Sequence, residues 1–225
     1  MKILGISCSP RKNGNTVAML TAALNAAKAA GAEVELYSVA GKNIQPCTGC
    51  WACHGTATCT LKDDMQELYE KIIAADGIIF GTPIYSWGMT AQSKSIIDRT
   101  VALNKPPRSL TNKVCGVVAC CGSLGLTDAL KDYAYFAVQK RMLPANQVAA
   151  YLANPGELQR SKKCLKALDD LGRQMVALVK MNFKYPEEFF KGPGAFGSNT
   201  NSDEGLSPRR VLNKLYSLTK KDGEG

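Results

Sequence analysis

Short apolar segments alternate with segments of helical spacing along most of the chain, and this alternation limits the fold more than any other feature. The apolar segments end in loops rich in Ser, Pro, Gly and Asn, and are predicted to be strands over residues 2–7, 34–39, 77–83, 113–121 and 147–154. Helices are predicted over residues 15–30, 63–76, 90–103 and 161–181, with a further one ending at 140. This order predicts the α/β class: a doubly wound five-stranded parallel sheet with helices on both faces and right-handed crossovers.

The helix expected over residues 63–76 carries a start signal. Asp63 stands where an N-cap is expected, and Gln66 follows it at the spacing of a capping box. We therefore expect the Asp63 side chain to cap this helix and Gln66 to bond back to it.

Composition changes near residue 182, where a stretch rich in Pro, Gly, Ser and Asn begins. We therefore predict a domain over residues 1–181, with an inserted cysteine loop over 47–59, and a C-terminal extension over 182–225. Ser207 and Pro208 suggest the start of a short helix within the extension.

The formal net charge of +9 raises the question of a nucleic-acid partner. Lys and Arg are spread along the chain, and neither a basic helix nor an aromatic-basic RNA motif accompanies them. The charge is expected to attract anionic cofactors and acidic partner proteins, or simply to be solvated. No apolar run reaches the ~18 residues of a membrane span, and the first ten residues do not read as a secretory signal, so a cytoplasmic protein is expected.

Four of the nine cysteines fall within thirteen positions, in the sequence CTGCWACHGTATC. In a reducing compartment such a cluster indicates metal or redox use rather than disulfides. Two consecutive gaps of two residues allow one tight loop to supply three thiolates to an iron-sulfur cluster, and the fourth follows five residues later. Redox-active thiols and a zinc site remain alternatives. Zinc is the less favoured metal, because structural zinc loops more often join two separated cysteine pairs. His54 is a less suitable ligand than the four thiols beside it.

The other five cysteines lie in apolar or helical surroundings. Cys8, Cys115 and Cys164 are expected to be buried small apolar side chains. The Cys120–Cys121 pair ends a predicted strand, with no neighbouring charge in the sequence that would lower a thiol pKa.

The loop SCSPRKNGNT, residues 7–16, joins the first predicted strand to the first helix, where a doubly wound fold binds phosphate. A helix start offers unpaired N–H groups and a partial positive charge, and Gly14 lets the backbone approach a ligand. The loop lacks the Gly-Lys-Ser/Thr of a Walker A sequence. A polar turn that merely caps the helix is the plainer interpretation.

Three segments resemble the FMN-contacting loops of the flavodoxin-like NADPH-dependent FMN reductase family: GISCSPRKNGNT (5–16), GTPIYSWGMTAQSKSIIDR (81–99) and ACCGSLG (119–125). Within that family, the spacing of the cysteine loop resembles the iron-sulfur flavoproteins. The resemblance covers about residues 1–180 and implies a flavodoxin-like fold. It implies an FMN phosphate site at Ser9, Arg11, Asn13, Gly14, Asn15 and Thr16, a flavin-ring site at Pro83, Ile84, Tyr85, Ser86, Trp87 and Gly88, and further ring contacts from Gly122, Ser123 and Gly125.

The same resemblance implies a 4Fe-4S cluster held by Cys47, Cys50, Cys53 and Cys59. It implies an FMN-dependent oxidoreductase that moves electrons, with no catalytic side chain, NADPH, NADH or ferredoxin as redox partner, and a homodimer or homotetramer. The alternatives are an NAD(P)H-dependent flavin, quinone or nitro-compound reductase without a cluster, and a non-enzymatic flavin-binding or zinc-stabilised module.

Overall fold

The computed structural model describes residues 1–53, 58–105 and 108–186. The stretch Met1–Tyr185 forms one compact unit. His54 and the predicted helix after Ser207 lie outside the described residues, so the predicted C-terminal extension stays a prediction. In the part of the chain that the structure describes, no helix is long and apolar enough to cross a membrane.

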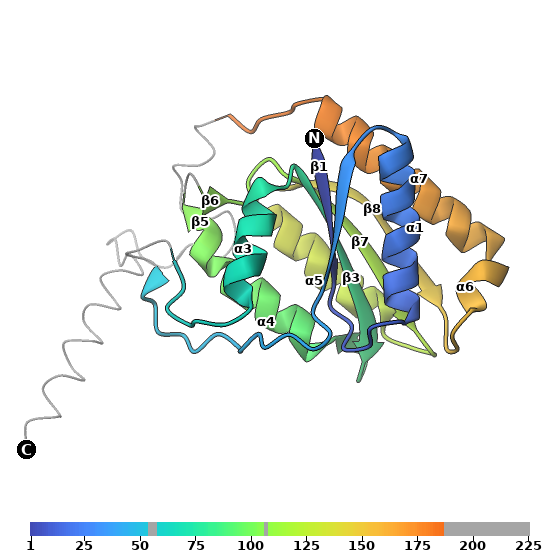
Figure 1. Ribbon diagram of the computed structural model, residues 1–225, viewed down its shortest axis with the longest axis horizontal. Coiled ribbons are helices and arrows are strands. Elements are labelled where there is room, and N and C mark those ends of the chain that lie inside the picture. The colour runs from blue at the N-terminus through green and yellow to red at the C-terminus, as the bar shows by residue number, and fades with distance from the viewer. Residues whose placement is uncertain (54–57, 106–107, 187–225) are drawn as a thin grey trace, which may run out of the picture. The chain divides into compact units, whose positions relative to one another are not determined.

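Five parallel strands form the sheet in the order β2-β1-β3-β7-β8 (Figure 1). Their bounds are Lys2–Ser7 for β1, Glu33–Ser38 for β2, Gly77–Tyr85 for β3, Val114–Cys121 for β7 and Leu143–Tyr151 for β8. The predicted doubly wound fold is confirmed. A sixth strand, β4 (Gly88–Met89), was not predicted and pairs antiparallel with the end of β3.

Helices cover both faces of the sheet (Figure 1). One face carries α1 (Asn15–Ala29) and α7 (Lys162–Lys180), which pack on Ile3, Ile79 and Val118. The other carries α3 (Met65–Ala74), α4 (Ala91–Arg99) and α5 (Leu126–Gln139). The 3-10 turn η1 (Thr100–Leu103) extends α4, the short helix α6 (Glu157–Arg160) precedes α7, and β5 (Asn104–Lys105) pairs with β6 (Arg108–Ser109). Two apolar layers therefore sandwich the sheet, as parallel strands require.

Strands β3 and β8 differ from the sequence prediction by two residues or more. Strand β8 begins at Leu143 rather than at 147, because Pro144 is tolerated on an edge strand, where a ladder hydrogen bond can be missing. Strand β3 continues past Pro83 to Tyr85, because β4 folds back and pairs with its last two residues.

The predicted capping box forms only in part. The residue directly before α3 is Asp64, whose side chain makes no capping bond, but the Asp63 carboxylate accepts the N–H of Met65 at 3.1 Å, as a cap would, and also forms an ion pair with Arg99. The Gln66 side chain donates instead to the carbonyl oxygens of Cys59 (3.3 Å) and Leu61 (2.6 Å). Both side chains are thus used to hold the preceding loop.

Candidate functional site

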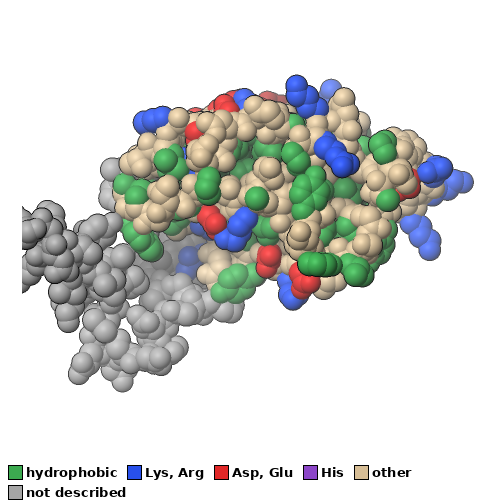
Figure 2. All heavy atoms as spheres, turned by 90° about the horizontal axis from the view of Figure 1, so that it is seen from below, with side chains coloured by type: hydrophobic (Ala, Val, Ile, Leu, Met, Phe, Trp, Pro, Cys, Tyr) green, Lys and Arg blue, Asp and Glu red, His purple; other side chains and the backbone are tan. Residues whose placement is uncertain are grey.

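The loops after β1, β3 and β7 emerge together at the carboxyl edge of the sheet, the lower edge in Figure 1. Ligands of open α/β sheets bind outside this edge where the strand order reverses, which here lies between β1 and β3. Figure 2 views the molecule from this side, and Lys and Arg side chains stand mostly around the margin of the face. The fold therefore brings the three predicted cofactor loops to one edge.

The first loop leaves the start of α1 uncapped. The N-cap is Gly14, and no side-chain cap bond is found there within the described residues, so the N–H groups of the first turn can donate to an anion. Ser9 is buried, and its Oγ accepts the N–H of Arg11 at 3.2 Å, which folds the loop toward the helix. The side chains of Arg11 and Asn13 are exposed beside this helix start.

The side chains of Asn15 and Thr16 are engaged within the protein. Asn15 Nδ2 donates to the carbonyl oxygens of Leu152 and Asn154, both at 3.0 Å, which ties α1 to the loop after β8. Thr16 is buried, with its Oγ1 3.2 Å from the Sγ of Cys120. Asn15 and Thr16 would therefore bind an anion at the helix start chiefly through their backbone N–H groups.

Strands β3 and β4 form a tight hairpin with Ser86 and Trp87 at its turn. Both residues have positive φ, 46° and 66°. A two-residue hairpin turn with positive φ at both positions normally takes Asn-Gly, so these two side chains are held in a strained backbone. Thr90 anchors the hairpin, because its Oγ1 donates to the Cys8 carbonyl oxygen at 3.0 Å.

The third loop packs directly on the turn of the hairpin. Gly125 has φ +93°, and a Cβ atom at this position would lie 2.5 Å from Trp87 Cα and 2.6 Å from the Trp87 carbonyl oxygen. Only glycine allows both the backbone angle and this approach. Gly122 and Ser123 are exposed just before it.

Large apolar side chains lie exposed around the same edge. Trp87 is 68% exposed and Leu124 64%, and they are joined by Tyr85 and Tyr151. Exposed apolar groups gathered beside a strained turn are typical of a binding surface. Leu124 and Tyr151 were not predicted, because neither residue type is distinctive in a sequence.

The cysteine loop, residues 47–59, is closed at its base by hydrogen bonds. Asn43 N donates to the Asp64 carboxylate at 2.6 Å, and Gln45 N donates to the Asp63 carboxylate at 2.8 Å. Asp64 N donates in return to the Asn43 carbonyl oxygen at 3.0 Å. The two limbs of the loop thus enter and leave at one place.

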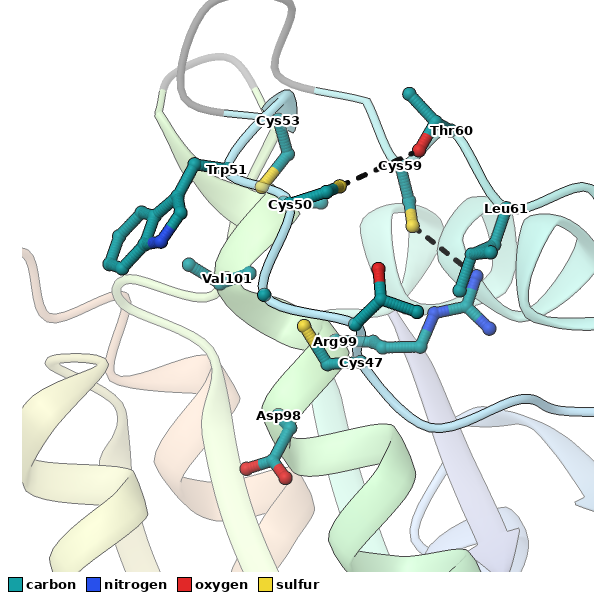
Figure 3. Close-up of a pocket in the computed structure, with 13 residues that line it drawn as sticks. Cys47, Cys50, Trp51, Cys53, Cys59, Thr60, Leu61, Asp98, Arg99 and Val101 are labelled. Carbon is teal, nitrogen blue, oxygen red and sulfur yellow. Dashed lines mark hydrogen bonds between the residues drawn. The ribbon is translucent and has the colours of Figure 1, made fainter. Parts of the chain in front are cut away.

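All four loop cysteines line one cavity of about 200 Å³ (Figure 3). Within the described residues, none of the four forms a disulfide. Trp51, Leu61 and Val101 add apolar walls, and Asp98 and Arg99 come from the end of α4. In the ranges that the structure describes, no three His, Cys, Asp or Glu side chains gather closely enough to hold a metal ion. The cysteines therefore share a cavity without converging on one point.

The loop thiols differ in their ionisation. The pKa of Cys53 is raised, first by burial and then by the charges of Cys59, Cys47 and Cys50. The pKa of Cys50 is lowered by hydrogen bonds from the Ala52 backbone and from Thr60 and Thr48. The four sulfur atoms are thus close enough to influence one another, and a bound cation would relieve their repulsion.

A buried ion pair supports this cavity. Arg99 is 1% exposed and pairs with Asp63, and its Nη1 donates to the Gln45 carbonyl oxygen at 3.1 Å. Its Nη2 donates to the Cys59 Sγ at 3.4 Å. Burial lowers the pKa of Arg99, but its bonds to Asp63 and Cys59 outweigh burial and hold that pKa above the usual range. Sequence analysis missed this pair, although Arg99 lies three residues after Ile96 and so on the same helix face, which was the available signal.

The remaining five cysteines are buried, as the sequence predicted for three of them. Burial raises the pKa of the Cys115 thiol to about 12 and that of Cys8 to about 11. Burial also raises the pKa values of Cys120 and Cys121. These groups remain thiols at neutral pH, which disfavours a redox pair at the end of β7.

A family model described as NADPH-dependent FMN reductase matches residues 1–154. The chain belongs to this family. Within it, the chain is 34% identical over 194 residues to an iron-sulfur flavoprotein of Methanocaldococcus jannaschii, covering 80% of this chain and 98% of the relative. It is 31% identical over 185 residues to one of Archaeoglobus fulgidus, covering 82% and 83%. The predicted membership is confirmed, and the family match supports FMN as cofactor and a flavin-dependent oxidoreductase activity.

Solved structures place this FMN reductase family member among flavodoxin-like folds. A flavone reductase superposes with a TM-score of 0.65 at 27% identity, covering 80% of this chain and 63% of its own. A flavodoxin from the domain Archaea superposes with a TM-score of 0.54 at 17% identity, covering 80% and 99%. The predicted flavodoxin-like architecture is confirmed.

Proposed function

We propose that the chain is an electron-transferring iron-sulfur flavoprotein that binds FMN at the carboxyl edge of its sheet and a 4Fe-4S cluster in the cavity of the cysteine loop. The observation that carries the proposal is that four cysteines of one short loop line one cavity in a chain of a flavin-dependent family. The names of the relatives point the same way.

The FMN phosphate would lie at the start of α1. The uncapped N–H groups there can donate hydrogen bonds to an anion, and the exposed Arg11 adds a charged donor. The β3–β4 hairpin would hold the flavin ring, with N–H groups of residues 85–88 directed at its polar edge and Tyr85 or Trp87 against its face. Gly122, Ser123 and Gly125 would border the ring on the other side.

The cysteine cavity suits an iron-sulfur cluster in its donor set. Four thiolates are the usual complement of a 4Fe-4S cluster, and Cys47, Cys50, Cys53 and Cys59 all reach one space. Besides burial, the charges of Cys59, Cys47 and Cys50 raise the pKa of Cys53, a repulsion that bound iron would remove. The Arg99 guanidinium beside Cys59 offsets the negative charge of such a ligand set.

When bound, the flavin exchanges one or two electrons and the cluster exchanges one, so together they link two-electron and one-electron partners. The protein would hold FMN by its phosphate, orient the ring with the hairpin and border the four cysteines with the apolar side chains of Trp51, Leu61 and Val101. The electron donor would be NADPH or NADH, as the family description suggests, or a ferredoxin. A homodimer or homotetramer is expected.

Anaerobic purification tests the proposal directly. We expect FMN together with about four iron and four sulfide per chain, and a broad visible absorbance that dithionite bleaches. Anaerobic exposure to a chelator should remove the iron while the FMN stays bound, because the two sites use different loops. FMN without iron, with rapid NAD(P)H oxidation, would contradict the cluster.

That outcome would instead favour a cluster-free reductase. The chain is 29% identical over 140 residues to an NAD(P)H-dependent FAD/FMN reductase of Geobacillus thermodenitrificans, covering 60% of this chain and 70% of that protein. The observation that favours a cluster-free reductase is that no three metal-ligating side chains converge among the described residues.

Replacing Asn15 by alanine should weaken FMN binding. The variant loses both bonds from Asn15 Nδ2 to the loop after β8, so the start of α1 is held less firmly at the phosphate. We expect the dissociation constant of FMN, measured by flavin fluorescence quenching, to rise about tenfold, equivalent to about 1.4 kcal/mol. Asn146→Ala, at an exposed position earlier in β8, is the matched control and should bind FMN normally. Equal affinity in the two variants would show that the tie does not matter.

A further inference from the structure

Arg99 is the only Lys, Arg, Asp or Glu that is buried as a whole residue within the described ranges. It stands at the end of α4, on the wall of the cysteine cavity (Figure 3). A buried guanidinium is tolerated only where its charge is paired and its donors are satisfied. Its partners therefore indicate what it is there to do.

Asp63 supplies the opposite charge, and its side chain is 3% exposed. Its carboxylate also accepts backbone N–H groups from Gln45 and Met65, so it is fixed at the base of the cysteine loop. The pKa of Asp63 is held below its usual value: burial raises it, and the bonds from Arg99 and Gln45 more than reverse that effect. The ion pair is therefore charged on both sides at neutral pH.

Asp63 does not use all the donors of Arg99. Nη2 donates to the Cys59 sulfur at 3.4 Å, and Nε is buried with no hydrogen-bond partner among the residues that the structure describes. Arginine cannot shed its charge, so a full positive charge stands permanently against one of the four thiols. A simple structural ion pair would not need to present a donor to that sulfur.

We infer that Arg99 sets the reduction potential of the iron-sulfur cluster, through its positive charge and its N–H···S hydrogen bond to Cys59. The inference rests on the proposed function. Reduction adds one electron to a ligand set that is already negative, so a nearby cation favours the reduced state. Net charge and hydrogen bonds to sulfur are among the factors that fix such potentials. Arg99 acts through Cys59 and is a positioning residue.

Opposite charge changes within the pair give the test. Arg99→Gln removes the positive charge, and Asp63→Asn removes the negative charge while leaving Arg99 beside the sulfur. We expect Arg99→Gln to lower the midpoint potential of the cluster by about 59 mV, which is about a tenfold change in the ratio of reduced to oxidised cluster for one electron. Asp63→Asn should raise the midpoint potential, by about a threefold change in the same ratio. Midpoint potentials are measured on the anaerobic holoprotein by dithionite titration with electron paramagnetic resonance.

Lys94→Gln is the matched control, because it removes one charge from the same helix at a side chain that is 61% exposed. Solvent screens such a charge, so Lys94→Gln should change the ratio of reduced to oxidised cluster at a given potential by no more than about twofold. FMN and iron content are measured for each variant to show that it is folded and loaded.

Opposite shifts from Arg99→Gln and Asp63→Asn support the inference, since a general loosening of the loop would move both variants in one direction. Unchanged potentials, shifts of one sign, or an equal shift in Lys94→Gln overturn it. If Arg99→Gln does not fold because Asp63 is left buried and unpaired, the sign of the Asp63→Asn shift decides alone. A wild-type protein that binds FMN but no iron would instead overturn the proposed function, and the inference with it.

Discussion

Replacing Gly125 by alanine should weaken FMN binding at least about a hundredfold, equivalent to about 2.8 kcal/mol. The new Cβ atom would lie 2.5 Å from Trp87 Cα, a backbone atom that cannot rotate away, and the residue would have to hold φ near +93°. The β3–β4 hairpin must therefore move, and with it the backbone proposed to hold the flavin ring. Calorimetric titration of the apoprotein with FMN measures the effect.

Gly31→Ala separates the two causes. Gly31 has a similar φ of +96°, but a Cβ atom there would meet nothing within 4 Å. This variant should lose some thermal stability through backbone strain and keep its affinity for FMN. Should Gly125→Ala bind FMN as tightly as Gly31→Ala, the contact with Trp87 would have no role in the site.

Replacing Cys50 by alanine should remove most of the iron, about nine-tenths or more, because a 4Fe-4S cluster lacking one protein ligand is poorly held. Cys50 is exposed, so its loss leaves no hole in the packed core and the fold should be kept. FMN content should not change. Iron, sulfide and flavin are measured on the same anaerobic sample.

Cys164→Ala is the control for this variant. Cys164 is a buried free cysteine on α7, and it packs in the apolar layer on the α1 side of the sheet. Its loss should lower stability by about 1 kcal/mol and leave the iron in place. Equal iron in both variants would show that the cysteine loop does not ligate it.

The layout of the sheet could be predicted because strand and helix periods are strongly marked in this chain. A fully buried strand such as β7 and an amphipathic helix such as α7 leave patterns that tertiary contacts rarely overrule. The position of the three cofactor loops follows from the same alternation, because parallel strands all end at one edge.

Features that depend on distant contacts could not be predicted. The hairpin turn at Ser86 and Trp87 has none of the residues that normally mark such a turn, and the packing of Gly125 against it stabilises this strained conformation. The sequence around Asp63 predicts only a local capping role, whereas in the structure its carboxylate also pairs with Arg99, thirty-six residues away. A local sequence pattern gives no sign of such a distant partner.

Helix α4 joins the two parts of the site. Thr90, its N-cap, bonds to the residue after β1 beside the β3–β4 hairpin, and Arg99, its last residue, bonds to Cys59. Nine helical residues span about 13.5 Å, so the length of this helix sets the separation between the proposed flavin site and the proposed cluster site. A single inserted residue would lengthen it by about 1.5 Å and rotate Arg99 by about 100° away from Cys59. Exchanging cysteine loops between relatives would therefore succeed only where the length of this helix is exchanged with them.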